Sequence, residues 1–500
     1  MNLLDDARVA LVRDVARYPK APPYHPSESF PEWSNLPIAS EENSVYRAIR
    51  HLFYQLNLDI ENYDTPDWNP LSEIIQPGNV VILKPNFVYH RNLAETSDGL
   101  TSTDSLVTHG SVIRGVLDYV AKALKGFGKI IIGDCPIQGA DWSQLIRLVG
   151  LNQIQAYFKE FFPSLELLIK DYRLGKAVVR GGMIVERIVD ETSLSNYEEV
   201  DLKQESLLIP LMLGKHEFGV AQYPKHRMRK AHTLDHNKYL FHQDFLYADV
   251  IINLPKMKSH MKAGVTCALK NLVGINGHKD YLPHFRFGSP KNGGDEYPDG
   301  NWLWDLMWFF HHTDWEIEKG SLKRFFFYAA RACALGLRLA GAPRGPSALG
   351  GGSWYGNDTL WRTVLDINRA FFYFNRKTKL IDNQISSDIK YLTILDGVIG
   401  GQKESPLEPT PIQSGVMMAA FNPLAMDAVA TAMMGFDIKK IKQICEGFSL
   451  ESLPLANFRW ENVKICGNPT LACVQDIYTQ NAYTSFEPSQ GFKGFVEYTS

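Results

Sequence analysis

The sequence predicts an α/β protein whose mostly parallel sheet is flanked by helices and interrupted by large insertions. Three predicted buried strands support this prediction, at residues 80–83, 129–134 and 248–255, and each contains a short apolar run. Strands buried on both faces of a parallel sheet have such runs in place of an alternating pattern. Residues 109–125 have a helical pattern and separate the first two runs, which gives a strand–helix–strand unit. The insertions leave room for two lobes around a cleft.

The remaining elements follow from the same patterns of hydrophobicity. A proline-rich N-terminal segment is expected to be irregular apart from one helix. Gly435 is expected to end the last helix of the core, since glycine readily adopts the left-handed conformation that follows a helix. The predicted helices span residues 44–56, 321–342 and 424–434, and the further strands lie at about 177–188, 206–213, 391–397 and 414–420.

The chain divides into three parts along its length. Residues 1–75 are expected to form an N-terminal extension, because the first buried run starts only after a Pro-Gly turn signal. Residues 76–440 form the predicted α/β core, with insertions at about 274–360, where polar and glycine-rich sequence begins. Residues 441–500 form a C-terminal segment.

Composition excludes several classes of protein. The 500 residues are 45% hydrophobic, 21% charged and 12% aromatic, which is ordinary for a globular protein and excludes disordered, collagen-like and coiled-coil chains. A net charge of −3 provides no general attraction to nucleic acid. The six cysteines are scattered without a CxxC pair, so no encoded iron–sulfur cluster is expected. Acidic residues near the N-terminus, without an apolar run, predict a cytoplasmic protein.

Polar side chains follow the predicted buried strands, at the edge of the sheet where α/β proteins bind ligands. Lys84 and Asn86 follow the first run. Asp134 ends the second run, and Lys256 follows the third. Each residue alone is more typical of a helix cap or a turn. Together, and with two lysines among them, they indicate a shared anion-binding cleft.

The densest group of basic residues lies in residues 255–300, interleaved with glycines that let a backbone approach a ligand closely. Lysines and backbone amides together suit phosphate or carboxylate groups. A solvated basic surface is the alternative. From this stretch we select His260 and Lys270 as catalytic residues, and Thr266, Asn271 and Arg286 as ligand-binding residues.

A metal site is a further hypothesis for the same stretch. His284, Asp295 and Glu296 offer nitrogen and oxygen ligands that suit a divalent ion. Ordinary salt bridges within the loop would explain these residues equally well. His232 and His236 stand four residues apart, as in zinc proteases, but the glutamate of that motif is missing.

Familiar catalytic motifs are absent from the sequence. It contains no GxGxxG motif after a strand, no GxxxxGK[ST] motif and no GxSxG motif, which argues against dinucleotide, P-loop and serine-hydrolase functions. His109 stands at the head of a predicted helix, where a histidine acts either as a neighbour of the cap or as a catalytic acid and base.

Residues 321–342 form a mostly apolar helix that Arg331 and Arg338 interrupt. Its apolar stretches are too short to span a bilayer, which takes about 20 residues. A helix in the core or at an interface is one interpretation. Peripheral contact with a membrane surface is the other.

Two ionisable residues are expected near the ligand. Asp427 lies in an apolar helix and should be paired with a lysine or with backbone amides, because an unpaired buried carboxylate is costly. Lys270 should be largely buried near a helix end. A structural lysine there would meet Asp134 or Asp427, whereas a functional lysine would point toward a ligand.

Five segments of the sequence carry a resemblance to a known family. They read VVILKPNFV, THGSVIRGV, IIIGDCPIQGA, ADVIINLPKMKSHMKAGVTCALKNLVGI and FNPLAMDAVATAMMGFD. They resemble the domain-of-unknown-function family 362 over roughly residues 78–440. Many members of that family carry an appended four-iron ferredoxin module, which this sequence lacks. The segment PHFRFGSPKNGGDEYPDG is similar to a branch of the family with large insertions.

The same segments are more distantly similar to the nickel-dependent lactate racemases. That resemblance implies two histidines that act as a paired acid and base, with His109 and His260 in comparable places. It also implies a lysine ten residues after the second histidine that carries a pyridinium nickel-pincer cofactor, and Lys270 holds that position. The racemases have a further nickel-binding histidine, for which His278 or His284 could stand in.

Two functions are consistent with these residues. In the first, the protein is an enzyme that acts on a small or sugar-like anion, such as a hydroxy acid or a phosphorylated or carboxylated compound. It would use histidine acid–base or hydride chemistry, like a racemase or an epimerase, with a divalent metal or a nickel-pincer cofactor as a possible aid. In the second, the protein is a non-catalytic, anion-binding accessory protein that associates with a membrane. The oligomeric state does not follow from the sequence.

Overall fold

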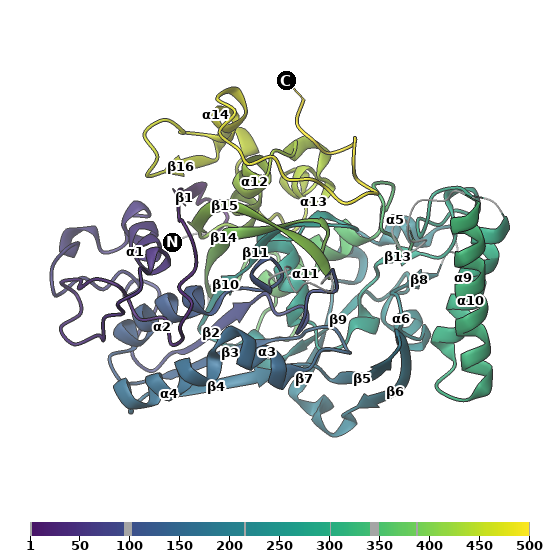
Figure 1. The fold of residues 1–500 in the computed structure, drawn as a ribbon, viewed down its shortest axis with the longest axis horizontal. Coiled ribbons are helices and arrows are strands. Elements are labelled where there is room, and N and C mark those ends of the chain that lie inside the picture. The colour runs from purple at the N-terminus through teal and green to yellow at the C-terminus, as the bar shows by residue number, and fades with distance from the viewer. Residues whose placement is uncertain are drawn as a thin grey trace.

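One large mixed sheet organises the computed structural model (Figure 1), which describes residues 3–94, 103–214, 217–300, 302–340, 350–386 and 389–499. Within these ranges the strands follow the order β16-β1-β15-β14-β10-β2-β3-β4, and β11 and β12 extend the sheet beside β14. The strands from β14 to β4 are all parallel to one another. The prediction of a mostly parallel α/β sheet is therefore confirmed, and the arrangement in two lobes around a cleft stays a prediction.

The central strands of this sheet are apolar on both faces, which explains the continuous apolar runs in their sequence. The bounds are β1 Arg8–Val12, β2 Val80–Pro85, β3 Lys129–Asp134, β4 Glu166–Asp171, β10 Val250–Leu254, β11 Lys256–His260, β12 Gly264–Val265, β14 Lys390–Glu404, β15 Glu408–Ala420 and β16 Lys464–Cys466. The smaller two-stranded sheets pair β5 (Gly175–Arg180) with β6 (Met183–Val189), β7 (Tyr197–Asp201) with β9 (Lys238–His242), and β8 (Phe218–Gly219) with β13 (Phe285–Arg286).

Helices cover both faces of the parallel strands. On one face α1 and α2 share a hydrophobic core with Leu83 and Ile132, and on the other α11 shares a core with Ile82 and Ile131. None of the described helices is long and apolar enough to cross a membrane. The bounds are α1 Ser44–Gln55, α2 Gly110–Leu124, α3 Trp142–Val149, α4 Leu151–Phe161, α5 Ile209–Met212, α6 His226–Ala231, α7 Gln243–Tyr247, α8 Cys267–Asn271, α9 Trp302–Glu316, α10 Ser321–Leu339, α11 Leu360–Phe372, α12 Pro423–Met433, α13 Lys442–Cys445 and α14 Val474–Thr479.

Segments from both ends of the chain complete the main sheet. Strand β1, from the N-terminal segment, pairs antiparallel with β15 and parallel with β16, which comes from the C-terminal segment. Both segments therefore extend the sheet of the core. The helix expected in the N-terminal segment is confirmed as α1. The sequence does not predict β1, because the four apolar residues between Arg8 and Arg13 are too few to show a period that distinguishes a strand from a helix.

Most of the other predicted elements are confirmed, although β14 continues to Glu404 and β15 begins at Glu408, each well beyond its predicted bound. Strands β2, β3, β10, β14 and β15 and helices α2, α10 and α12 lie where the hydrophobic patterns place them. The strand expected at residues 206–213 is wrong, since helix α5 lies there. Pro210 explains the difference, because it lacks an amide N–H and therefore suits the first turn of a helix.

Deleting residues 1–75 should prevent the remaining chain from folding. The deletion removes β1 and α1, exposes the edge of β15 and uncovers the core that Tyr46, Ile49 and Phe53 help to form. An exposed apolar edge promotes aggregation. We expect the truncated protein to be insoluble or to lose cooperative urea unfolding, monitored by circular dichroism. A soluble truncation that unfolds at the wild-type midpoint would instead show that residues 1–75 are a separate extension.

Candidate functional site

Strand β11 brings three basic side chains into the interior of the protein. It continues β10 beyond Pro255, and the long strand β14 pairs with both of them. All five residues of its sequence KMKSH are buried. Because side chains alternate along a strand, Lys256, Lys258 and His260 share one face, and Met257 lies on the opposite face in an apolar cluster.

An ion pair joins the carboxyl ends of β2 and β3. The ammonium of Lys84 lies 2.7 Å from the carboxylate of Asp134, and both side chains are buried. Asp134 also accepts the backbone N–H groups of Phe87 at 2.7 Å and Cys135 at 2.8 Å. A Cβ atom at Gly274 would lie 2.2 Å from the Asp134 carboxylate. Only glycine at this position lets the backbone after α8 pack directly against the pair.

Asn271 connects this ion pair to the neighbouring strand. Its side-chain oxygen accepts hydrogen bonds from Asn86 at 2.8 Å and from Lys84 at 3.3 Å. Its amide donates to Asn253, near the end of β10, at 2.7 Å. The structure therefore brings four predicted residues together at the predicted edge of the sheet, namely Lys84, Asn86, Asp134 and Asn271.

A second group of residues surrounds Asp396 on β14. The ammonium of Lys256 lies 3.1 Å from its carboxylate and donates to the hydroxyl of Tyr18 at 2.6 Å. Tyr18 in turn donates to Asp396. The backbone N–H of His109 also donates to Asp396, at 2.9 Å, and its ring stacks on Tyr18 with the ring centroids 4.0 Å apart. His109 and Lys256 thus belong to one hydrogen-bonded group.

The hydrogen bonds of His109 and His260 fix where these two rings carry a proton. Nδ1 of His109 accepts the backbone N–H of Ser111 at 3.1 Å. Nδ1 of His260 accepts the backbone N–H of Lys262, also at 3.1 Å. A nitrogen that accepts a hydrogen bond is unprotonated, so both neutral rings carry their proton on Nε2. Each ring presents a proton donor at that atom.

Both of these rings are neutral near pH 7. Burial lowers the pKa of His109 to about 3, against the opposing effect of the Asp396 carboxylate. Burial also lowers the pKa of His260 well below its usual value, and the ammonium groups of Lys270 and Lys262 lower it further. The pKa of His109 is therefore affected by a neighbouring carboxylate, and that of His260 by neighbouring ammonium groups.

His284 has the opposite arrangement. Its Nδ1 donates to the backbone carbonyl of Leu282 at 2.7 Å, and a carbonyl oxygen can only accept. A lone pair is therefore left on Nε2. Burial lowers the pKa of His284 well below its usual value, and the ammonium groups of Lys262 and Lys270 lower it further. This ring is neutral near pH 7 and presents a proton acceptor.

Lys258 lies between the Asp396 group and Lys270. Burial lowers the pKa of Lys258 well below its usual value, and the ammonium groups of Lys256 and Lys270 lower it further. Its Nζ donates to the backbone carbonyl of Leu106 at 2.7 Å. No carboxylate of the described residues forms an ion pair with it. The interior here holds a basic group without a counter-charge.

Lys270 is half-buried in the last turn of α8, and no described residue forms a hydrogen bond or an ion pair with its ammonium. Asp134, one partner expected for a structural lysine, is bound to Lys84. Burial, with smaller effects from the ammonium groups of Lys279, Lys262 and Lys84, lowers the pKa of Lys270 to about 7. Near pH 7 both the charged and the uncharged forms of this amine are therefore present.

Asp427 holds the N-terminal end of α8. Its completely buried carboxylate accepts the backbone N–H groups of Ala268 at 2.6 Å and Leu269 at 3.1 Å. The prediction that backbone amides pair with Asp427 is confirmed. Burial raises the pKa of Asp427 to about 8, against the two hydrogen bonds that favour the carboxylate. Asp427 therefore positions the helix that carries Lys270 and Asn271.

Two further predicted ligand-binding residues have partners within the protein. The hydroxyl of Thr266 lies 3.4 Å from the backbone carbonyl of Ser259 on β11. The guanidinium of Arg286 lies 3.4 Å from the carboxylate of Asp295. Thr266 thus lies beside the strand that carries His260, and Arg286 lies in an ion pair.

The three residues proposed as metal ligands each have other contacts. Asp295 accepts a hydrogen bond from the hydroxyl of Thr359 at 2.7 Å, and Glu296 lies 2.8 Å from Nε2 of His312. His284 is surrounded by ammonium groups, which repel a cation. In the part of the chain that the structure describes, no three His, Cys, Asp or Glu side chains gather closely enough to hold a metal ion.

The nickel-pincer cofactor that the racemase resemblance implies stays a prediction. Lys270 offers an amine for covalent attachment, and Nε2 of the neighbouring His284 offers a lone pair. A nickel ion needs nitrogen, sulfur or oxygen ligands of this kind. The charged groups around Lys270 are the lysines Lys84, Lys262 and Lys279, whose ammonium groups offer no lone pair and oppose a cation.

Replacing Asp427 with Asn should destabilise the protein. An amide has one oxygen where the carboxyl group, ionised or protonated, has two, so the NH2 group of Asn faces one of the two backbone N–H donors. A buried donor without a partner costs about 1–3 kcal/mol. We expect the free energy of unfolding in urea to fall by about this amount. Asp437→Asn is the matched control, because Asp437 caps a short surface helix and Asn caps equally well. Equal stability of both variants would contradict the role of Asp427.

Comparison with known proteins adds one finding to this geometry. No curated protein shows a significant match to the chain. A family model matches somewhat less than half of the chain, from the residues before β8 to the last turn of α12, and the matched part includes all of β11 and α8. Residues 214–432 thus match the family described as "Domain of unknown function (DUF362)".

Proposed function

We propose that the residues around β11 and α8 bind a small or sugar-like polar anion, such as a hydroxy acid or a phosphorylated or carboxylated compound. The observation that carries this proposal is an imbalance of charge. Several lysines gather here, and within the described residues two of them form ion pairs with carboxylates. These pairs are Lys84 with Asp134 and Lys256 with Asp396. The lysines are Lys84, Lys256, Lys258, Lys262, Lys270 and Lys279.

The energetic consequence of this imbalance supports a ligand with negative charge. A basic group in the interior is costly unless an opposite charge compensates it. Burial lowers the pKa values of Lys84 and Lys256, but the carboxylate paired with each of them opposes the shift. Burial also lowers the pKa values of Lys258 and Lys270, and there neighbouring ammonium groups lower them further. An anion placed between these two side chains would favour their charged forms and would gain charge-assisted hydrogen bonds from both.

The histidines supply the groups for proton transfer to and from such a ligand. His284 presents a lone pair on Nε2, and His260 presents a proton on Nε2. A base on one side of a carbon atom and an acid on the other can invert that carbon, and each contributes roughly 10²–10⁴-fold to the rate. Nearby ammonium groups would stabilise negative charge that develops during proton removal. We therefore propose an enzyme similar to a racemase or an epimerase.

A non-catalytic, anion-binding accessory protein is the second candidate, because the same lysines would serve it equally well. Nuclear magnetic resonance in D₂O separates the two. The protein is incubated with lactate, other hydroxy acids and sugar phosphates, and exchange of the hydrogen on the carbon that bears the hydroxyl is followed. Exchange or a new product supports the enzyme. Binding without exchange supports the accessory protein, and the absence of binding in calorimetry contradicts both.

Replacing Lys258 with Met should weaken anion binding without destabilising the protein. Methionine fills a similar volume and removes a buried basic group that lacks a counter-charge. We expect the Kd for inorganic sulfate, measured by calorimetry, to rise roughly tenfold or more. The midpoint of urea unfolding should be unchanged or higher. Lys464→Met, on the exposed side of β16, is the matched control and should change neither value. A large loss of stability in Lys258→Met would indicate a structural lysine.

Anion binding should weaken as the pH rises from 6 to 8. The pKa of Lys270 is lowered to about 7, so its ammonium is charged below this value and loses its charge above it. Sulfate is the suitable probe, because phosphate groups themselves change charge near this pH. In Lys270→Arg the side chain stays charged, so the pH dependence should weaken while binding at pH 8 improves. Lys262, whose pKa burial lowers to about 8, accounts for the dependence that is left. Unchanged pH dependence in that variant would assign the titration to another group.

A further inference from the structure

Helices α9 and α10 form a hairpin at the right-hand edge of the view in Figure 1, where they pack against each other. Its outer surface is unusually apolar for a surface in contact with water. Single exposed apolar residues are common on protein surfaces, but here several large ones gather on two helices. Their side chains are 57% to 83% exposed. They are Trp302 and Phe309 on α9, and Leu322, Phe325, Tyr328, Leu335 and Leu339 on α10.

The apolar surface is continuous across the two helices. The rings of Phe309 and Phe310 lie 5.8 Å apart, centroid to centroid. Phe310 reaches Phe326 on the other helix at 6.0 Å, and Phe326 lies 5.4 Å from Phe325. A row of four aromatic rings therefore links the exposed Phe309 of α9 to the exposed Phe325 of α10.

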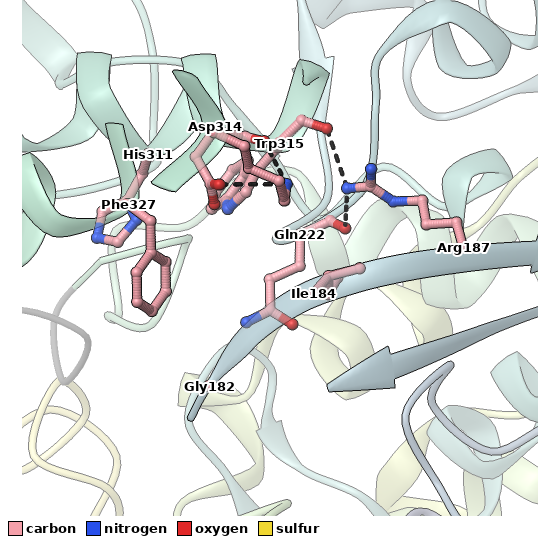
Figure 2. Close-up of a pocket in the computed structure, with 9 residues that line it drawn as sticks. Gly182, Ile184, Arg187, Gln222, His311, Asp314, Trp315 and Phe327 are labelled. Atoms are coloured by element: carbon pink, nitrogen blue, oxygen red, sulfur yellow. Dashed lines mark hydrogen bonds and ion pairs between the residues drawn. The ribbon is translucent and has the colours of Figure 1, made fainter. Parts of the chain in front are cut away.

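The opposite face of the hairpin is fixed to the body of the protein. A cavity of about 90 Å³ lies between the hairpin and strand β6. Figure 2 shows Arg187 at its side, with the guanidinium directed toward Trp315 of the hairpin. Arg187 donates to the backbone carbonyl of Trp315 at 3.0 Å, and Arg331 donates to that of Gly181 at 3.2 Å. Lys323 lies 3.2 Å from Asp314 within the hairpin. These contacts leave the apolar face directed away from the body.

Positive charge accompanies the apolar face. Helix α10 contains basic residues and no acidic residue. Arg324, Arg331 and Arg338 are exposed and stand seven residues apart, which places them along one side of the helix. Phe325, at the next position after Arg324, lies about 100° further around the helix. The arginine row therefore runs along the edge of the apolar face.

We propose that this hairpin rests its outer face on the surface of a membrane that contains anionic lipids. Amphipathic helices that lie in the lipid interface combine Trp, Phe and Leu on one side with Lys and Arg beside them. Arg324 and Arg338 would meet the negative headgroups while the aromatic row enters the boundary of the acyl chains, and Arg331 stays bound to Gly181 of the body. Helix α10 would lie along the membrane surface, in agreement with the arginines that interrupt its apolar residues.

A second copy of the chain fits this surface less well. In a symmetric dimer each copy uses the same patch, so the arginine rows of the two copies would approach each other. Like charges that are brought together in an interface repel. An anionic lipid surface instead supplies charge of the opposite sign along the whole row.

Flotation with lipid vesicles tests this proposal on the full-length protein. Vesicles of phosphatidylcholine are compared with vesicles that also contain phosphatidylglycerol. We expect binding to the anionic vesicles, weaker binding to the neutral ones, and a decrease as salt is added. Phe325→Gln/Leu335→Gln should reduce the bound fraction at least about tenfold, because two large apolar side chains no longer enter the lipid. Arg324→Gln/Arg338→Gln should remove the preference for phosphatidylglycerol.

The control is Leu213→Gln/Leu380→Gln, which removes two exposed leucines outside the hairpin, 73% and 57% exposed, and should bind as the wild type does. Light scattering in the absence of lipid gives the oligomeric state of each variant. Failure of the wild type to bind anionic vesicles overturns the proposal. An equal loss of vesicle binding in the hairpin and control variants also overturns it. A third contradicting outcome is a wild-type protein that does not bind vesicles and forms a dimer, which Phe325→Gln/Leu335→Gln converts to a monomer. These outcomes are independent of sulfate binding near Lys258.

Discussion

The pairing of β14 with both β10 and β11 is the constraint on which the candidate site depends. A strand with three basic residues can lie in the interior only if its backbone N–H and C=O groups have partners. Strand β14 provides them beyond the end of β10, opposite Lys256 and Lys258. Two glycines of β14 permit this approach, since a Cβ atom at Gly397 would lie 2.7 Å from the sulfur of Met257, and one at Gly401 would lie 3.0 Å from Cβ of Lys258.

The lysines that this pairing buries divide into two kinds. Lys84 and Lys256 have carboxylate partners and are held in fixed positions, so they belong to the framework of the site. Lys258 and Lys270 have none among the described residues, and neighbouring ammonium groups add to the lowering of the pKa that burial causes. Conflicts between a local rule and the structure are typical of functional sites, where stability is given up for binding or catalysis. An apolar residue at position 258 would serve the fold better than lysine does.

The sequence predicts the edge of the sheet well, because apolar runs mark buried strands and the next polar residue marks their end. Lys84, Asp134 and Lys256 follow from this rule, and the structure places each in an ion pair. The alternation in KMKSH could also have indicated a strand, with Lys258 on the same face as Lys256. Tyr18 could not be predicted, because it reaches Asp396 across 378 positions of the sequence and lies in a proline-rich segment. Such contacts depend on tertiary structure alone.

The hydrogen bonds of the histidines change the acid–base scheme that the racemase resemblance implies. A pair formed by His109 and His260 needs one ring to accept a proton at the start, yet both rings carry a proton on Nε2. His109 would also lose its hydrogen bond to the head of α2 if its tautomer changed. In the proposed racemase-like reaction a third group would therefore accept the proton. His284 has the required lone pair, and the uncharged fraction of Lys270 near pH 7 has one as well. Both belong to the lysine-rich group that also contains His260, so proton transfer within that group needs no contribution from His109.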